Sequence, residues 1–239
     1  MSLARPYRVY SGRIAYIGDG DGAGPVERGR EWFTVSVYDD GNRTIAARCE
    51  IDDAVVVRDV TYSVDARWRP VDAFIRLNVH GRFMGSGWFR FTDTFAECET
   101  FMAGGGRVSQ RIDCGSGEEG HGAVSFGAHP VACDVWHLGV HEPSATALGS
   151  PVKHRAFMSS LLPNGASGPM LSAWNFGVEY LGDERLTVAA GTFDTHHFRY
   201  LLDGHPDEHV WYTTADRILV RIRWDLLRTT YELAELTYR

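Results

Sequence analysis

The sequence contains almost no lysine: Lys153 stands alone, and arginine supplies the other basic side chains. Runs of basic residues are missing, and the formal net charge is −7. Nucleic acids and anionic membrane surfaces are bound mainly through clustered basic side chains. We therefore expect neither a nucleic-acid partner nor a membrane partner.

Long apolar runs are missing as well, and no segment approaches the roughly 18 apolar residues of a membrane-spanning helix. The N-terminal stretch MSLARPYRVYSG lacks the apolar core of a secretory signal. The cysteines, at positions 49, 98, 114 and 133, form no C-x-x-C pair. These features favour a cytoplasmic protein with free thiols.

Signatures of covalent catalysis are absent too. The chain has no G-x-S-x-G elbow, and none of its cysteines lies in a recognisable catalytic motif. Hydrolysis through a covalent nucleophile is therefore disfavoured, and the sequence predicts no cofactor.

Short alternating stretches, by contrast, fill most of the chain. The clearest has one set of side chains, Ile218, Val220, Ile222 and Trp224, alternating with another, Arg217, Leu219, Arg221 and Arg223. A period of two is typical of a strand with one buried face. The aromatic content of 12% also suits strands.

Similar stretches recur from the N-terminus onward, separated by short Gly, Pro, Asp and Asn clusters. Expected strands cover residues 7–17, 32–38, 44–50, 54–64, 71–79, 82–92, 95–101, 107–112 and 171–181, and continue to the C-terminus. Asp39-Asp40-Gly41-Asn42 is a strong hairpin signal between two of them. Short connections favour antiparallel pairing of sequential neighbours.

We expect a mainly all-β fold, in which one antiparallel up-and-down meander of about a dozen strands closes into a barrel or half-barrel. Residues 1–239 form a single domain in this interpretation. A loop-rich insertion with a short helix interrupts the meander at about 114–170. A barrel of more than about eight strands leaves room for a ligand inside.

The C-terminal segment resembles a known kind of protein. The resemblance rests on Val210-Trp211-Tyr212, on Asp216 at a turn, on Leu219-Val220-Arg221-Ile222 and on Thr230-Tyr231-Glu232-Leu233. These residues are similar to the closing hairpins of uncharacterised bacterial proteins with lipocalin-like or lipoprotein-carrier-like curved antiparallel sheets. The resemblance implies the fold and brings no catalytic set with it.

Two adjacent histidines, His196 and His197, are candidates for acid–base chemistry. Neighbours on a strand point to opposite faces, so only one of them can reach an interior. Histidine titrates near neutral pH, which suits a general acid or base. The alternative is an ordinary hydrogen-bonded strand histidine.

Asp134, His137 and His141 form a second candidate group. If Val131–Val140 is helical, these side chains lie along one face. One carboxylate and two imidazoles are a possible zinc or iron set, but Gly139 and Pro143 count against a regular helix through His141. We expect no metal here, and a lid that brings Asp134 and His137 to a barrel mouth instead.

Ligand-binding candidates lie on other strands. They are Trp211, Tyr212, Arg221, Arg223 and Trp88. Aromatic side chains can line an apolar cavity, and an arginine that points into it can bind a carboxylate or phosphate. The alternatives are core packing for the aromatic residues and a polar outer face for the arginines.

These patterns predict binding of a small hydrophobic molecule, such as an aromatic, terpenoid, steroid or fatty compound, in the cavity. The alternative is a cofactor-free isomerase, hydratase or lyase that acts through His, Tyr and Asp side chains. A homodimer is compatible with either function.

Overall fold

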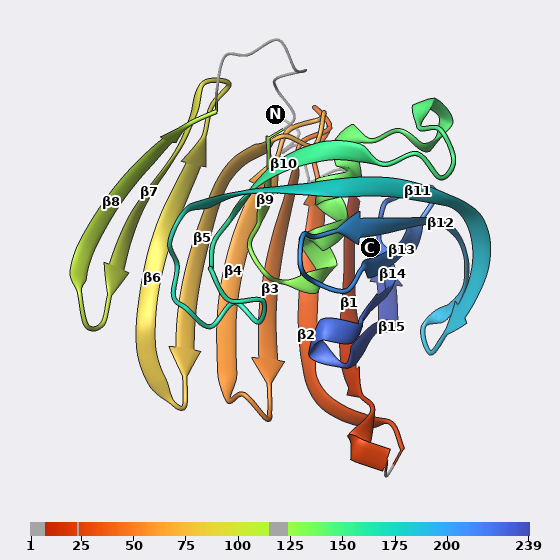
Figure 1. Ribbon diagram of the computed structural model, residues 1–239, viewed down its shortest axis with the longest axis horizontal. Coiled ribbons are helices and arrows are strands. Elements are labelled where there is room, and N and C mark those ends of the chain that lie inside the picture. Colours follow the sequence, from red (N-terminus) through yellow and green to blue (C-terminus); the bar gives the residue numbers. More distant parts are fainter. Residues whose placement is uncertain (1–7, 23, 115–123) are drawn as a thin grey trace.

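The computed structural model describes residues 8–22, 24–114 and 124–239 (Figure 1). Two stretches with sequence-based expectations lie outside the described residues. They are residues 1–7, most of the N-terminal stretch in which no secretory signal was expected, and residues 115–123 of the expected insertion. The described strands form one 15-stranded sheet in the order β8-β7-β6-β5-β4-β3-β2-β1-β15-β14-β13-β12-β11-β10-β9. All neighbours pair antiparallel except β9 and β10, which run parallel.

The elements have the following bounds. The first half of the sheet holds β1 (Arg8–Gly18), β2 (Val26–Val37), β3 (Arg43–Ile51), β4 (Val56–Val64), β5 (Pro70–Val79), β6 (Arg82–Phe91), β7 (Phe95–Met102) and β8 (Gly106–Asp113). The second half holds β9 (Val124–Gly127), β10 (Val152–Met158), β11 (Ser172–Val188), β12 (Gly191–Leu201), β13 (Glu208–Thr213), β14 (Leu219–Trp224) and β15 (Thr229–Tyr238). The helical elements are the 3₁₀ helices η1 (Gly20–Gly22), η2 (Val131–Val140), η3 (Pro143–Ala145) and η4 (Asp225–Leu227).

The expected all-β meander is confirmed, and it forms a half-barrel because the sheet stays open between β8 and β9. Hydrogen bonds from side chains, in place of backbone pairing, connect the two sides of this gap. Gln110 on β8 accepts a hydrogen bond from the Leu171 amide at 3.0 Å and donates one to the Leu171 carbonyl at 3.2 Å. Arg155 on β10 donates to the Cys114 carbonyl at 2.8 Å.

The expected insertion contains more regular structure than its sequence suggests. Both β9 and β10 lie in stretches expected to be irregular, and the described sheet has 15 strands where about a dozen were expected. The β10 segment VKHRAFM alternates, but its inward positions include His154 beside Ala156. A buried histidine in place of an apolar residue hides the period-two signal.

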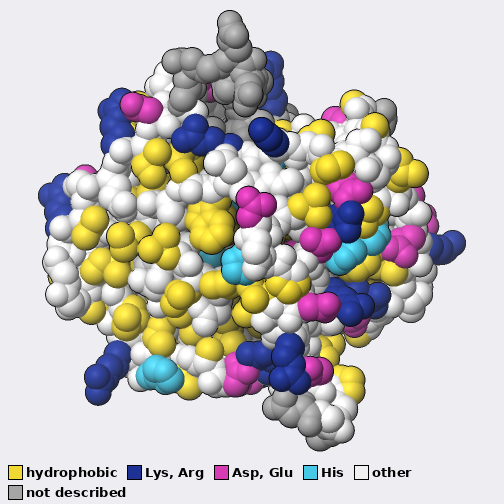
Figure 2. All heavy atoms as spheres, viewed as in Figure 1, with side chains coloured by type: hydrophobic (Ala, Val, Ile, Leu, Met, Phe, Trp, Pro, Cys, Tyr) yellow, Lys and Arg dark blue, Asp and Glu magenta, His cyan; other side chains and the backbone are white. Residues whose placement is uncertain are grey.

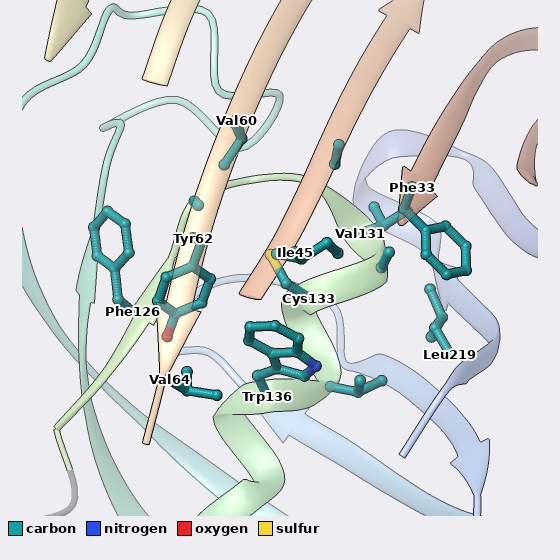
Figure 3. Packing of buried hydrophobic residues seen from close by; sticks show 14 of the residues in the cluster. Phe33, Ile45, Val60, Tyr62, Val64, Phe126, Val131, Cys133, Trp136 and Leu219 are labelled. Carbon is teal, nitrogen blue, oxygen red and sulfur yellow. The ribbon is translucent and has the colours of Figure 1, made fainter. Parts of the chain in front are cut away.

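The sheet folds over so that its second half passes in front of the first, with η2 held between them (Figure 1). Trp136 of η2 packs against Tyr62 of β4 at 5.2 Å between ring centroids, and Tyr62 also contacts Phe126 of β9 at 5.6 Å (Figure 3). All three side chains are almost completely buried. These aromatic contacts join the two halves into one core.

Local sequence explains where η2 lies. Pro130 immediately precedes it as the N-cap residue, and its extended backbone (φ −67°, ψ 125°) marks the start of the helix. Near its end, Gly139 passes so close to Trp68 that a Cβ on residue 139 would lie 2.1 Å from the Trp68 Cβ. Only glycine permits this approach. Among the described residues, no helix has the length and apolar character needed to cross a bilayer.

Candidate functional site

A pocket lies between η2 and the strands that fold over it. Its wall is mostly apolar and aromatic, with side chains from both halves of the sheet, from η2 and from the segment before β11. Prominent members are Met158, Trp174, Phe176, Leu202, Trp224 and Leu227. The cavity volume is about 120 Å³. On the face drawn in Figure 2, hydrophobic side chains gather at the left and centre, and charged ones gather at the right.

Two carboxyl groups reach the pocket, from Asp134 in the first turn of η2 and Glu208 at the start of β13. Tyr200 of β12 donates its hydroxyl proton to the Asp134 carbonyl oxygen at 2.8 Å and fixes η2 against the sheet. Burial raises the pKa of Asp134 well above its usual range, and the nearby charge of Glu208 raises it further. Burial also raises the pKa of Glu208. The pair therefore keeps at least one proton at neutral pH.

Glu31 of β2 holds the start of η2 in place. Its buried carboxylate accepts hydrogen bonds from the amides of Val131 at 2.9 Å and Ala132 at 3.0 Å. It also accepts from the Tyr16 hydroxyl at 2.8 Å and the Cys49 thiol at 3.2 Å. Burial raises the pKa of Glu31, while these four donors act in the opposite direction. An acidic cap at the first amides of a helix also complements the helix dipole.

A chain of buried histidines leads away from the pocket wall. The Ser125 hydroxyl of β9 lies 2.6 Å from His137 Nδ1 and 2.6 Å from His154 Nε2. His154 Nδ1 lies 3.0 Å from His141 Nε2. Burial lowers the pKa of His137 to about 4, and burial together with the neighbouring histidines lowers the pKa of His154 to about 2. Both imidazoles are therefore neutral at pH 7.

A buried arginine anchors the segment that covers the pocket. Arg58 of β4 is only 2% exposed and donates to the carbonyl oxygens of His129 at 3.1 Å and Asn164 at 2.7 Å. Gly165, with φ of 71°, lets the chain pass the guanidinium, since a Cβ there would lie 2.1 Å from Arg58 Nη2. The Nε2 atom of His129 is buried and has no hydrogen-bond partner among the described residues. Burial lowers the pKa of this ring to about 3.

The candidate residues from the sequence are distributed over several places. Asp134 and His137 both line the pocket. His196 lies opposite Tyr212 in the β12–β13 register, on the core-facing side, and bonds to Asp183 at 2.5 Å instead of to the pocket groups. Tyr212 is fully buried, and its hydroxyl accepts a hydrogen bond from Arg217 at 3.3 Å.

The remaining candidates lie on the outer face of the sheet. His197 stacks on Trp211 at 4.1 Å between ring centroids. Arg221 pairs with Glu232 at 2.6 Å, and Arg223 pairs with Asp225 at 3.2 Å. Trp88 is 40% exposed. The structure brings none of these side chains to the pocket wall.

Several residues at or behind the pocket wall escaped the sequence interpretation. Glu208 and Tyr200 line the pocket, and Ser125 and His154 lie behind it, bonded to the pocket-lining His137 or to each other. Glu208 had a usable signal, because it alternates with Val210 and Tyr212 and so shares their core-facing side. Ser125 and His154 had no usable sequence signal, since both lie in stretches expected to be irregular. All four cysteines are free and buried, and within the described ranges no group of three or more His, Cys, Asp or Glu side chains is placed to hold a metal ion.

Comparisons with known proteins bear on the fold. No family model and no curated protein matches the sequence. A β-barrel-like protein of the domain of unknown function DUF1849 from Brucella abortus is similar over 97% of this chain and 98% of its own, with a TM-score of 0.59 and 11% identity. The chain has a β-barrel-like fold.

Two further solved structures are more distant. A DUF1089 family protein from Pseudomonas aeruginosa has a TM-score of 0.43 at 11% identity, over 82% of this chain and 90% of its own. An exported protein with a YmcC-like fold from Bacteroides fragilis has a TM-score of 0.35 at 7% identity, over 95% of each chain.

Proposed function

We propose that the protein binds a small, mainly apolar molecule in the pocket between η2 and the folded-over strands, as a lipocalin-like binding protein does. The observation that carries this proposal is the composition of the wall, in which apolar and aromatic side chains surround a few polar groups. Ligand sites in proteins usually have this composition.

The cavity volume narrows the ligand class. A cavity of about 120 Å³ is close to one of roughly 150 Å³ that accepts benzene. The volume therefore favours a single aromatic ring or a compact terpenoid over a steroid or a long fatty chain. Asp134 and Glu208 lie at the wall, so a hydroxyl or amine on the ligand would find a hydrogen-bond partner there.

Native mass spectrometry of the purified protein tests the proposal, with extraction to identify any bound compound. We expect a compact organic molecule that a Leu202→Trp variant, which fills the pocket, does not retain. Trp88→Ala on the outer face is the matched control and should retain the compound. Equal retention by all three proteins would place the ligand outside this pocket.

A second candidate function is a cofactor-free isomerase, hydratase or lyase. The pair Asp134 and Glu208 favours it, because burial raises the pKa of both carboxyl groups, and such groups can donate and accept protons at neutral pH. His137 adds a neutral imidazole at the same wall.

The compound recovered from the protein, incubated in D₂O, distinguishes the two functions. Turnover should place deuterium in the compound, and Glu208→Gln should abolish this incorporation while the compound still binds. Binding without incorporation by the native protein would leave the binding function alone.

A further inference from the structure

The histidine chain behind the pocket wall has a continuous hydrogen-bond geometry. Three bonds, of 2.6, 2.6 and 3.0 Å, run from His137 through Ser125 and His154 to His141. Ser125, His137 and His154 are at most 4% exposed, whereas His141 is only partly buried. The chain thus connects a pocket-lining ring to one that reaches the surface.

Hydrogen-bond chemistry allows this chain two self-consistent states. Ser125 has a single hydroxyl proton, so it donates to one imidazole and accepts from the other. If His137 carries its proton on Nδ1, Ser125 donates to His154 Nε2, and His154 then carries its proton on Nδ1 and donates to His141. In the second state every one of these bonds has the reverse direction.

We propose that His137, Ser125, His154 and His141 form a proton relay between the pocket and the protein surface. The relay rests on the proposed function only in that it takes the pocket as the ligand site. It gives a bound molecule a route for proton exchange with solvent after water has been displaced from the pocket.

Each transfer in the relay is balanced. A proton from the pocket binds His137 Nε2, the Nδ1 proton of that ring passes to Ser125, and the hydroxyl proton of Ser125 passes to His154 Nε2. The Nδ1 proton of His154 moves to His141 Nε2, and His141 releases its own Nδ1 proton to water. The net result is one proton moved outward with all three rings neutral, and the reverse sequence returns a proton to the pocket.

The surroundings suit neutral rings. Phe176 packs against His154 at 5.0 Å and against His137 at 5.9 Å between ring centroids. Burial and the positive charge of Arg217 lower the pKa of His141, which favours release of its extra proton. Arg217 is itself paired with Glu142 at 2.7 Å.

NMR of the full chain with ¹⁵N-labelled histidine tests the relay without any ligand, because long-range ¹H–¹⁵N correlations show which ring nitrogen carries the proton. At about pH 7 we expect neutral His137 and His154 with protons on corresponding nitrogens, both Nδ1 or both Nε2, or in exchange between these two states. Opposite tautomers, or a doubly protonated His154, would overturn the relay.

A second variant tests transmission along the chain. His141→Leu removes the bond to His154 and should change the tautomer ratio at His137. Among the described residues, the ring of His141 contacts that of His154. A change at His137 would therefore be transmitted through His154 and Ser125. An unchanged His137 would overturn the relay. His209→Leu is the matched control, since it removes the 2.9 Å bond between His209 and His197 on the outer face and should leave His137 unaffected.

Ser125 provides the last check. In a Ser125→Ala background, His141→Leu should no longer affect His137, whereas Ser125→Thr keeps a hydroxyl and should preserve the effect. An effect of equal size without the hydroxyl would show that it travels by another route. His141 is half-buried, so the single His141→Leu variant decides the matter even if Ser125→Ala does not fold. Loss of ligand binding in the pocket tests would leave these results intact.

Discussion

The two halves of the sheet have different roles. Strands β1–β8 are 8–12 residues long and bury an almost purely apolar inner face. The second half, β9–β15 with η2, varies in strand length from 4 to 17 residues and supplies most of the polar groups around the pocket. One half therefore provides a regular wall, and the other provides most of the polar side chains at the pocket.

The exceptions in the first half support this division. Glu31 and Arg58 are buried charged residues on β2 and β4, and both use their hydrogen bonds to hold the inserted segment: Glu31 holds η2, and Arg58 holds the segment that covers the pocket. Buried charges are costly unless they are fully hydrogen-bonded. In the regular half, these two buried charged side chains are therefore found where they hold the segments that form the pocket.

Removal of Glu31 should have the largest effect on stability. Glu31→Ala leaves the two η2 amides, the Tyr16 hydroxyl and the Cys49 thiol without their acceptor. We expect a loss of about 4 kcal/mol or more in the free energy of unfolding, measured by urea denaturation. Glu97→Ala, on a partly exposed pair, should cost less than about 1 kcal/mol. Equal losses of stability in the two variants would contradict the distinction between the buried Glu31 and the partly exposed Glu97.

Trp136 joins the two halves, so its truncation comes next. Trp136→Ala should cost about 3–4 kcal/mol, because it opens a cavity between Tyr62 and η2. Trp88→Ala on the outer face should cost less than about 1 kcal/mol, since this side chain is 40% exposed. Thermal or urea unfolding of both variants compares them directly, and similar costs would mean that η2 is not part of the core.

Protonation of the buried histidines should lower the stability of the protein in acid. His137 and His154 have pKa values lowered to about 4 and about 2 by burial, so they stay neutral when folded but take up protons below about pH 6.5 when unfolded. Their contribution is therefore complete above that pH and is lost as the pH falls. A double His137→Gln, His154→Gln variant should therefore lose about 2–4 kcal/mol less stability than the native protein between pH 7 and pH 5, measured by urea unfolding at both pH values. The same pH dependence in both proteins would contradict the burial of these rings.

Glu208 should give the opposite pH dependence. Its folded-state pKa is raised, so stability falls as the pH rises from its unfolded value of about 4.3 through the folded one. Glu208→Gln should remove this fall, so the stability of the variant relative to the native protein should be about 3 kcal/mol higher at pH 8 than at pH 5. A constant difference between the two proteins across this range would show that Glu208 is ionised throughout.

Changes on the outer face should have the smallest effect. Arg223 and Asp225 form a pair in which both side chains are about two-thirds exposed, 64% and 65%. Arg223→Ala should change the free energy of unfolding by less than about 0.5 kcal/mol and leave pocket binding unaltered. Weaker binding in this variant would move the ligand site to the outer face.

The same division explains what the sequence could predict. Period-two alternation located most strands of the first half to within a few residues, and Val131–Val140 is helical as expected. Asp134 and His137 lie at the pocket because the inserted helix is short and faces the core. Ser125 and His154 could not be found, since long-range pairing of β9 with β10 brings them together and no local pattern encodes that pairing.

The two strand histidines show a second limit of sequence-based prediction. The alternation of side chains along a strand predicts that His196 and His197 face opposite sides of the sheet. It does not predict which end of the strand lies at a cavity. His196 is on the core-facing side yet bonds to Asp183, while Tyr200 and Glu208, farther along the same side, reach the pocket. The fold of the sheet over η2 decides this, and it depends on contacts between distant residues.

The central claim is that the pocket beside η2 is the ligand site, and saturation-transfer NMR with p-cresol tests it most directly. We expect transfer with the native protein and with Trp88→Ala, and binding at least about tenfold weaker in Leu202→Trp, a change of about 1.4 kcal/mol. Undiminished binding in Leu202→Trp, or its loss in Trp88→Ala, would contradict the claim.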